Sequence, residues 1–493
     1  MTSSFTCLER YCGSRFSCSL SVIAIVLTTA FASGCGGGPS GKTLPGNTTV
    51  VVMASSTADD QLVQFPVMLK NLTLTNQSGN TVTLFSTPVS AEFIHLNGNV
   101  EPMATANIPQ DTYTSATAEF GLTAPVCVGL QSQSTAFFIN GAMNGPGTPS
   151  VTVNLPAPIE VTGTAMGLVL NLQVSQSAPF SGGCVPGSLP VAVSPVFNLT
   201  PVVIAAQPTN STNGKAFGLE GAIASIAESG TGFTVTAPDG YFDGNPPTWQ
   251  VSTNGSTVFQ GISGASGLNT GTAVDMDVAL QADGSLMATR VAVYNTDATN
   301  LSLSSGQVLT ADASQSRLDG LGTQTVGGIS EMDDIFGYGN ATFQVSGQFT
   351  NLQNLPFVAT FNATNMVSGQ NVLVTSNAPP VNGALPLPLP LATMTLMPQT
   401  INGTVSETST SGGFTTYTVT LAPYDLFAEL AGQPGQPALT SPNTVLVYAD
   451  SKTQMLNSSS VSVGGVFRFY GLVFNDNGML TMDCAQVNDG VAE

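Results

Sequence analysis

Short runs of alternating apolar and polar residues cover most of the chain, which is the pattern of β-strands that bury one face. Leu69–Thr75 and Thr81–Phe85 are two such runs, and the polar, glycine-containing segment Asn76–Asn80 between them predicts a hairpin turn. In Val274–Leu280 every second residue is apolar, and two aspartates stand on the opposite face. Because such runs recur along the chain with turn residues between them, we expect an all-β protein.

The order of strand patterns repeats after residue 208. Gly218–Ile226 followed by Phe233–Thr236 corresponds to Ile401–Ser406 followed by Tyr417–Thr420 near the end of the chain. Both copies close on an Asp-Gly or Asn-Gly turn and a further strand, and a diverged copy lies between them. A repeat of this length is one supersecondary unit, so the second half of the chain is predicted to be a tandem array.

We therefore expect an N-terminal β-sandwich followed by three tandem small β-barrel repeats. Short strands with one buried face close well into a barrel, because closure removes exposed strand edges. Asp425 and Gly432 are cap signals that predict a short helical insertion in the last barrel. The expected bounds are 47–208 for the sandwich, 209–295, 296–400 (diverged) and 401–493 for the repeats, and 425–432 for the insertion.

The first 34 residues have the features of an export signal. Arg10 and Arg15 precede the apolar run Leu20–Phe31, which is too short to span a bilayer and is followed by small residues. The segment Ala32-Ser-Gly-Cys35 resembles the lipobox of bacterial lipoproteins. That resemblance implies cleavage before Cys35 and acylation of its thiol and amine, which anchors the protein stably in a lipid bilayer.

Residues 35–46 would then form a flexible tether, and Gly36 after the lipidated cysteine favours the outer membrane or cell surface. The alternative is an ordinary secretory signal peptide with a cysteine at this position by chance.

Two further resemblances concern the exported part. Ile108-Pro-Gln-Asp-Thr-Tyr113 is similar to a "Leu-Pro-Ala-Gly-x-Tyr" element of an uncharacterised domain that often begins bacterial surface lipoproteins. The repeats resemble a bacterial family of uncharacterised small β-barrel domains with a topology like that of the oligonucleotide/oligosaccharide-binding (OB) fold, over about 270 residues. The second resemblance implies no activity, because that family has no established one.

Charge excludes one class of partner. The chain has 29 acidic and 9 basic residues, a net charge of −20, and loss of the signal makes it one unit more negative. Such a surface repels nucleic acid and anionic headgroups, so we expect no nucleic-acid partner.

Cysteine usage fits an oxidising compartment. Cys127 and Cys184 flank one segment and are predicted to form a disulfide, with two buried thiols as the alternative. Cys484 lies in a strand pattern and is expected to be buried and unreactive.

Groups for catalysis are scarce. His95 is the single histidine, and it lies in the apolar run Phe93–Leu96, where a structural role is the usual one. One histidine leaves little room for a Ser-His-Asp or Cys-His site and none for a multi-histidine zinc site. The segment Gly261-Ile-Ser-Gly-Ala265 fails the nucleophile-elbow pattern at its last position. The expectation is therefore a protein that is not an enzyme and has no cofactor.

Three weak candidate sites remain. Glu331 and Asp333, near Tyr338, are close carboxylates that suit glycoside chemistry, or they form a solvated turn. Asp239 and Asp243 have oxygen ligands at a loop spacing that calcium accepts, although the terminal glutamate of an EF-hand is absent. Trp249 is the sole tryptophan, and it either stacks on a sugar at a loop edge or closes one end of a barrel.

The sequence thus favours a lipid-anchored, non-catalytic β-module protein of the cell envelope that binds a glycan or an envelope protein. The alternatives are a carbohydrate-active enzyme that uses paired carboxylates and a calcium-stiffened extracellular spacer.

Overall fold

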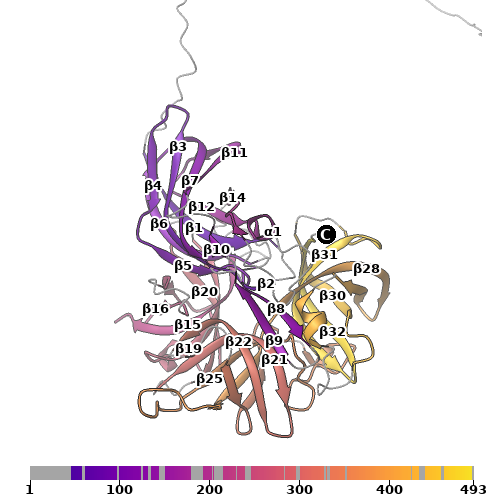
Figure 1. Cartoon of the computed structure of the whole chain (residues 1–493). Coiled ribbons are helices and arrows are strands. Elements are labelled where there is room, and N and C mark those ends of the chain that lie inside the picture. Colours follow the sequence, from indigo (N-terminus) through magenta and orange to yellow (C-terminus); the bar gives the residue numbers. More distant parts are fainter. Residues whose placement is uncertain are drawn as a thin grey trace, which may run out of the picture. The chain divides into compact units, whose positions relative to one another are not determined.

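The computed structural model confirms an all-β protein (Figure 1). Within the described residues, the α-helices are the short segments α1 (Val174–Ser177) and α2 (Leu426–Ala431). In that same part of the chain, no helix combines the length and apolar character needed to cross a membrane. The structure describes residues 46–490 except 58–61, 97–98, 124–125, 132–134, 141, 144–149, 179–191, 203, 205–214, 229, 239–245, 282–283, 296–299, 327–328, 330–333, 350–351, 423–424, 432–438 and 457–459.

Two sheets pack around one core in the N-terminal part. The first has the order β14-β12-β1-β6, in which β1 and β12 run parallel, and the second has the order β11-β7-β3-β4 with β5 beside β3. Val50 and Val52 of β1 and Leu69 and Leu72 of β3 belong to the shared apolar core. The bounds are β1 (Asn47–Ser56), β3 (Pro66–Asn76), β4 (Thr81–Phe85), β5 (Val89–Glu92), β6 (Glu101–Pro109), β7 (Asp111–Thr123), β11 (Ser150–Val161), β12 (Ala165–Leu172) and β14 (Phe197–Val202).

Smaller elements accompany this sandwich. One three-stranded sheet has the order β2-β8-β9, and β10 pairs with β13 in parallel. Their bounds are β2 (Leu62–Gln64), β8 (Val126–Gln131), β9 (Thr135–Asn140), β10 (Ala142–Met143) and β13 (Ala192–Val193).

The strands from 215 to 295 form a ring. The antiparallel order β17-β16-β15-β19-β20 is closed by a parallel pairing between β17 and β20, and β18 adds to β20. Inward residues such as Val274, Met276 and Val278 form its core. The bounds are β15 (Lys215–Ile226), β16 (Gly232–Thr236), β17 (Thr248–Ser252), β18 (Val258–Gln260), β19 (Ala273–Leu280) and β20 (Leu286–Asn295).

The C-terminal strands form a closed barrel with the same connectivity, β28-β29-β30-β32-β31. Here too the third and fifth strands, β30 and β32, pair in parallel and every other neighbour is antiparallel. Asp425 Oδ1 accepts the N–H of Phe427 at 2.8 Å, which caps α2 between the second and third strands. The bounds are β28 (Gln399–Ser411), β29 (Phe414–Leu421), β30 (Thr444–Met455), β31 (Val466–Asp476) and β32 (Met479–Asp489).

The middle strands follow the same order with an interrupted last strand. The sheet runs β24-β27-β25-β21-β22-β23-β26, and β26 and β27 are successive segments separated only by Leu391 and Ala392. The bounds are β21 (Ser302–Asp312), β22 (Arg317–Val326), β23 (Asp334–Gly337), β24 (Thr342–Val345), β25 (Asn371–Ser376), β26 (Leu389–Pro390) and β27 (Thr393–Leu396).

One glycine shows how closely the first and last repeats correspond. A Cβ on Gly221 would lie 2.3 Å from the carbonyl oxygen of Thr236, and a Cβ on Gly403 would lie 2.4 Å from that of Thr420. Because any side chain would collide with the backbone of the second strand, only glycine permits this approach in either repeat.

Candidate functional site

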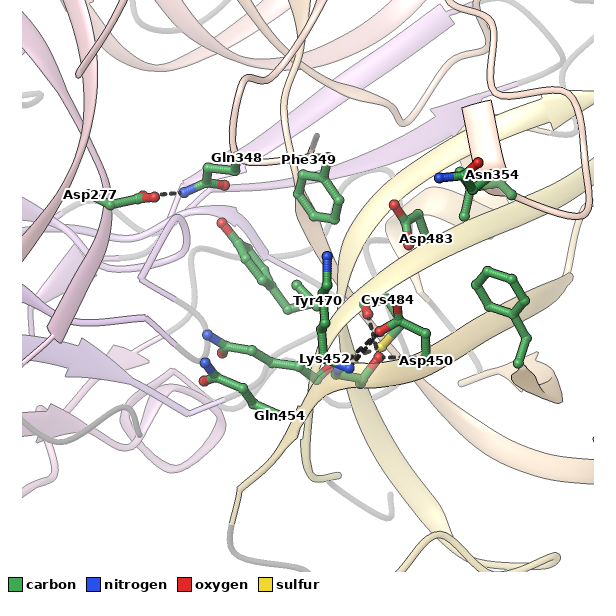
Figure 2. Close-up of a pocket in the computed structure, with 15 residues that line it drawn as sticks. Asp277, Gln348, Phe349, Asn354, Asp450, Lys452, Gln454, Tyr470, Asp483 and Cys484 are labelled. Carbon is green, nitrogen blue, oxygen red and sulfur yellow. Dashed lines mark hydrogen bonds between the residues drawn. The ribbon is translucent and has the colours of Figure 1, made fainter. Parts of the chain in front are cut away.

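A cavity of about 360 Å³ lies against the outer wall of the C-terminal barrel (Figure 2). It is bordered by β30, β31 and β32 and by Gln348, Phe349, Asn354 and Leu355, which lie in the chain between β24 and β25. The volume is at the lower end of the range of small-molecule sites. The lining residues are Asp277, Gln348, Phe349, Asn354, Leu355, Phe414, Asp450, Lys452, Thr453, Gln454, Tyr470, Asp483, Cys484, Ala485 and Gln486.

A bulge in β30 shapes one wall of this cavity. Ala449 pairs with Cys484 and Gln454 with Gln486, so four residues of β30 stand opposite one residue of β32. Asp450 Oδ1 accepts the N–H groups of Lys452 at 2.8 Å and Thr453 at 3.2 Å, which is the local turn that aspartate favours. The hydroxyl of Thr453 donates to the carbonyl oxygen of Cys484 at 2.8 Å and fixes the bulge to β32.

Asp483 places a carboxyl group in the cavity. Its strand neighbour Cys484 belongs to the barrel core, so the aspartate projects outward, and Figure 2 shows it facing the same opening as Phe349 and Tyr470. Burial, reinforced by the negative charge of Asp450 and opposed by Lys452, raises the pKa of Asp483 to about 6. This carboxyl group is thus ready to exchange a proton near neutral pH.

Two amide groups around the cavity have an oxygen atom that the protein leaves unpaired. Gln348 Oε1 and Gln454 Oε1 are buried and accept no hydrogen bond. Gln486, which is only 5 % exposed, lines the same cavity. Buried polar atoms are normally paired, so these groups are the ones that a bound molecule would satisfy.

Aromatic side chains form the other walls. Phe349 comes from the segment after β24, Phe414 begins β29, and Tyr470 lies on β31. The ring of Phe414 stands edge-on to that of Tyr448, with 6.4 Å between the ring centroids. The cavity therefore combines ring surfaces with hydrogen-bonding groups, which is the composition of a site for a polar small molecule.

A charged cluster holds the segment that carries Gln348. Gln348 Nε2 donates to Asp277 Oδ1 at 2.9 Å, as Figure 2 shows, and Arg290 Nε donates to Asp277 Oδ2 at 3.0 Å. Arg290 Nη2 donates to Asp275 Oδ2 at 2.8 Å, and Tyr294 donates to the same oxygen at 2.9 Å. Asp275 is fully buried and Arg290 is 6 % exposed, so this ion cluster is shielded from solvent.

His95 belongs to a second ionic group. Its Nδ1 lies 3.2 Å from Glu92 Oε2 and its Nε2 lies 3.0 Å from Glu101 Oε1. Burial alone would lower the pKa of His95, but the charges and hydrogen bonds of Glu101 and Glu92 outweigh it and raise the pKa to about 10. A protonated imidazole that donates to two carboxylates serves structure, because neither nitrogen remains available as a base.

Glu220 is a carboxyl group strongly affected by burial. It is 7 % exposed and its Oε2 has no hydrogen-bond partner. Burial first, and then the charge of Asp275, raise its pKa to about 8, against smaller opposing effects of Ser305 and His95. At neutral pH this carboxyl group is therefore largely protonated.

Two candidate ligand contacts are corrected by burial. Trp249 is 3 % exposed, belongs to the core of the first repeat and donates its indole N–H to the carbonyl oxygen of Pro102 at 2.7 Å. Tyr338 is 2 % exposed and packs edge-on against Phe343, with 5.9 Å between the ring centroids. Neither ring offers a face to a ligand, because the surrounding apolar residues cover it.

The remaining candidates stay predictions. Cys35, Glu331, Asp333, Asp239 and Asp243 lie outside the described residues. Cys184 does so too, and for Cys127 only its place in β8 is described, so the disulfide is also open. Within the described ranges, no group of three or more His, Cys, Asp or Glu side chains is placed to hold a metal ion.

Sequence reasoning missed the residues of the cavity. Asp483 and Gln486 are far along the chain from the segment Gln348–Leu355, and nothing in their local pattern marks them. The one usable signal was Asp450-Ser-Lys-Thr453, whose aspartate and threonine are typical of a turn within a strand pattern.

Comparison with known protein families finds a match for one stretch of the chain. Residues 220–292 match a domain of unknown function (DUF5666), and this stretch runs from within β15 to within β20. No curated protein matches the chain. The match supports an uncharacterised β-domain in the first repeat, as the sequence predicted, and assigns it no activity.

Proposed function

We propose that this chain is an exported, lipid-anchored β-module protein of the cell envelope whose role is to bind a small polar molecule without transforming it. The observation that carries the binding role is the cavity on the C-terminal barrel, where the buried amide oxygens of Gln348 and Gln454 have no protein partner. The anchor rests on the signal and the lipobox-like segment before Cys35.

The surroundings of the histidine and of the buried cysteine support a non-catalytic role. Both nitrogens of His95 are held by carboxylates, and burial raises the pKa of the Cys484 thiol well above its usual range. Neither residue is therefore suited to act as a nucleophile or as its base.

The test of location is intact mass and membrane fractionation after expression of the full chain in a bacterial host. We expect a membrane-associated species that begins at Cys35 and carries the mass of acyl chains. Surface labelling should then find it at the cell exterior. An unlipidated or cytoplasmic chain would contradict the proposed anchor.

A second function has one observation in its favour. Asp483, with its pKa raised to about 6, stands near Asp450 in the same cavity, and a pair of carboxyl groups in different environments is the machinery of glycoside hydrolysis. Turnover of an oligosaccharide that is lost in Asp483→Asn and retained in the exposed-site control Glu160→Gln would establish this function in place of pure binding.

A further inference from the structure

The first and third repeats carry different residue pairs at equivalent positions, and the pair of the third repeat lies at the cavity. Asp277 pairs with Arg290 across β19 and β20, and Tyr470 pairs with Gln486 across β31 and β32. Each pair stands next to a one-residue shift in register. The turns beside the two pairs are also equivalent. Thr257 Oγ1 accepts the N–H of Asn254 and donates to the carbonyl oxygen of Ala288, and Thr453 Oγ1 makes the same two bonds with Asp450 and Cys484. Gln486 therefore occupies the position of Arg290.

The two positions differ in the charge of the side chain that they carry. Arg290 donates hydrogen bonds to Asp275 and Asp277, and the side-chain amide of Gln348 also donates to Asp277. Gln486 is buried to a similar degree but carries no charge, and its side chain lines the cavity. In the same cavity, Gln348 Oε1 and Gln454 Oε1 are buried without a partner, which costs free energy unless a bound molecule or water pairs with them.

We infer that this cavity is a subsite for a neutral sugar, one ring or two in length, whose hydroxyl groups pair with Gln486, Gln454, Gln348 and Asp483. This inference rests on the proposed binding function and specifies its ligand.

The acceptors decide the class of ligand. Gln348 Oε1 and Gln454 Oε1 need hydrogen-bond donors, the Asp483 carboxylate beside them is a further acceptor, and a sugar ring supplies several hydroxyl donors at once. The amide of Gln486 both donates and accepts, which suits hydroxyl groups and ring oxygens. Phe349 and Tyr470 offer ring surfaces for the apolar C–H face of the sugar.

Electrostatics disfavour the competing ligands. Asp450 and Asp483 repel anions, and the chain as a whole carries a charge of −20. Lys452 at the rim offsets one carboxylate, which leaves less attraction for a cation. A neutral, hydroxyl-rich molecule satisfies the acceptors without these costs.

The test is isothermal titration of the full, acylated chain in a non-glycosidic detergent. The probes are glucose, galactose, N-acetylglucosamine and their β-1,4-linked disaccharides, with spermidine and CaCl₂ as competing classes. We expect saturable binding of at least one sugar, weakened roughly tenfold or more in Gln486→Leu and in Asp483→Asn. Glu160→Gln, which changes an exposed carboxylate on β11, should bind like the parent protein.

The folding of each variant is checked separately by circular dichroism and melting temperature. Gln454→Leu is a further substitution in the same cavity, on another strand. Sugar binding unaffected by all three cavity variants would overturn the assigned site. Binding of spermidine or calcium alone, weakened by the same variants, would overturn the sugar but keep the binding function. If no probe binds, the inferred ligand is wrong. The proposed envelope anchor is tested independently, by fractionation and surface labelling.

Discussion

Single residues in this protein are governed by what surrounds them more than by their type. Asp483, Glu220 and Cys484 lie in strands of ordinary composition, yet burial raises the pKa of all three. Asp312, a solvent-accessible aspartate, has its pKa lowered instead, by hydrogen bonds from Ser314 and from the backbone N–H groups that follow it. The difference follows from the surroundings, because burial favours the neutral form of an acidic group whereas hydrogen bonds to a carboxylate favour its charged form.

Glu220 makes the stability of the protein depend on pH. Its pKa is about 8 in the folded chain against 4.5 ordinarily, so its contribution to stability is present below pH 4.5 and is lost as the pH rises to about 8. Glu220→Gln removes this titration, and the variant should be more stable than the parent at pH 7 by roughly 1–3 kcal/mol. Asn402 at the equivalent position of the last repeat shows that an amide fits there.

Urea unfolding at pH 5 and pH 8 measures this effect. The gain in unfolding free energy should be larger at pH 8, and Glu160→Gln should show no such gain. An equal change at both pH values would mean that the carboxyl group is not titrating in the folded protein.

Cys484 should react slowly with thiol reagents. It is 4 % exposed, its thiol donates to the carbonyl oxygen of Gln486 at 3.2 Å, and burial raises its pKa. Since the thiolate is the reactive form, labelling by iodoacetamide at pH 8 should be slow in the native state and rapid in urea. Mass mapping of the peptide that contains residue 484 reports this rate, and rapid labelling of the native protein would contradict the burial.

At the scale of elements, the repeats are defined by close contacts between neighbouring strands. The hairpin β3–β4 forms at its predicted place, where Asn76 Oδ1 accepts the N–H groups of Ser78 and Asn80 and Gly79 has a φ of +82°. In the barrels, Gly221 and Gly403 lie in the first strand where it crosses the second most closely. Such positions follow from the backbone path and tolerate only glycine.

Gly403→Ala tests this constraint. The added Cβ would meet the carbonyl oxygen of Thr420 at 2.4 Å, so β28 and β29 must separate. We expect a loss of about 1–3 kcal/mol in unfolding free energy, measured by urea denaturation. Gly255→Ala is the matched control, because a Cβ on Gly255 would have no atom within 4 Å, and its stability should stay within about 0.5 kcal/mol of the parent. Equal stability of the two variants would contradict the proposed collision.

For the whole molecule, polar contacts link segments that are distant in sequence. Trp249 of the first repeat donates to Pro102, and Gln348 of the second repeat donates to Asp277 of the first. Gln370 Nε2 donates to the carbonyl oxygen of Val473 at 2.9 Å and joins the second repeat to the third. These bonds are buried or partly buried, so each is costly to break once water is excluded.

Arg290→Met should weaken the polar contacts between the first and second repeats. Removing the guanidinium leaves the fully buried carboxylate of Asp275 and the partly buried one of Asp277 without their main partner, and we expect a loss of about 3–5 kcal/mol in unfolding free energy. Hydrogen exchange at Gly347, whose N–H donates to Tyr294, should also become faster. Arg290→Lys keeps the charge without the forked geometry, and its stability should fall between those of the parent and Arg290→Met. An unchanged unfolding midpoint in Arg290→Met would show that the cluster contributes no net stability.

The sequence by itself determined the all-β class, the hairpin at Asn76–Asn80, the short helix near residue 425 and the recurrence of the first repeat in the last. These features follow from local periodicity, turn chemistry and capping, which act over a few residues. Tertiary structure alone decided that Asp275 and Asp277 face an arginine, that Trp249 and Tyr338 are buried, and that a cavity forms beside Gln486. Each of those outcomes depends on the register in which strands pair and on which segment covers each face, whereas alternation shows only that two faces exist.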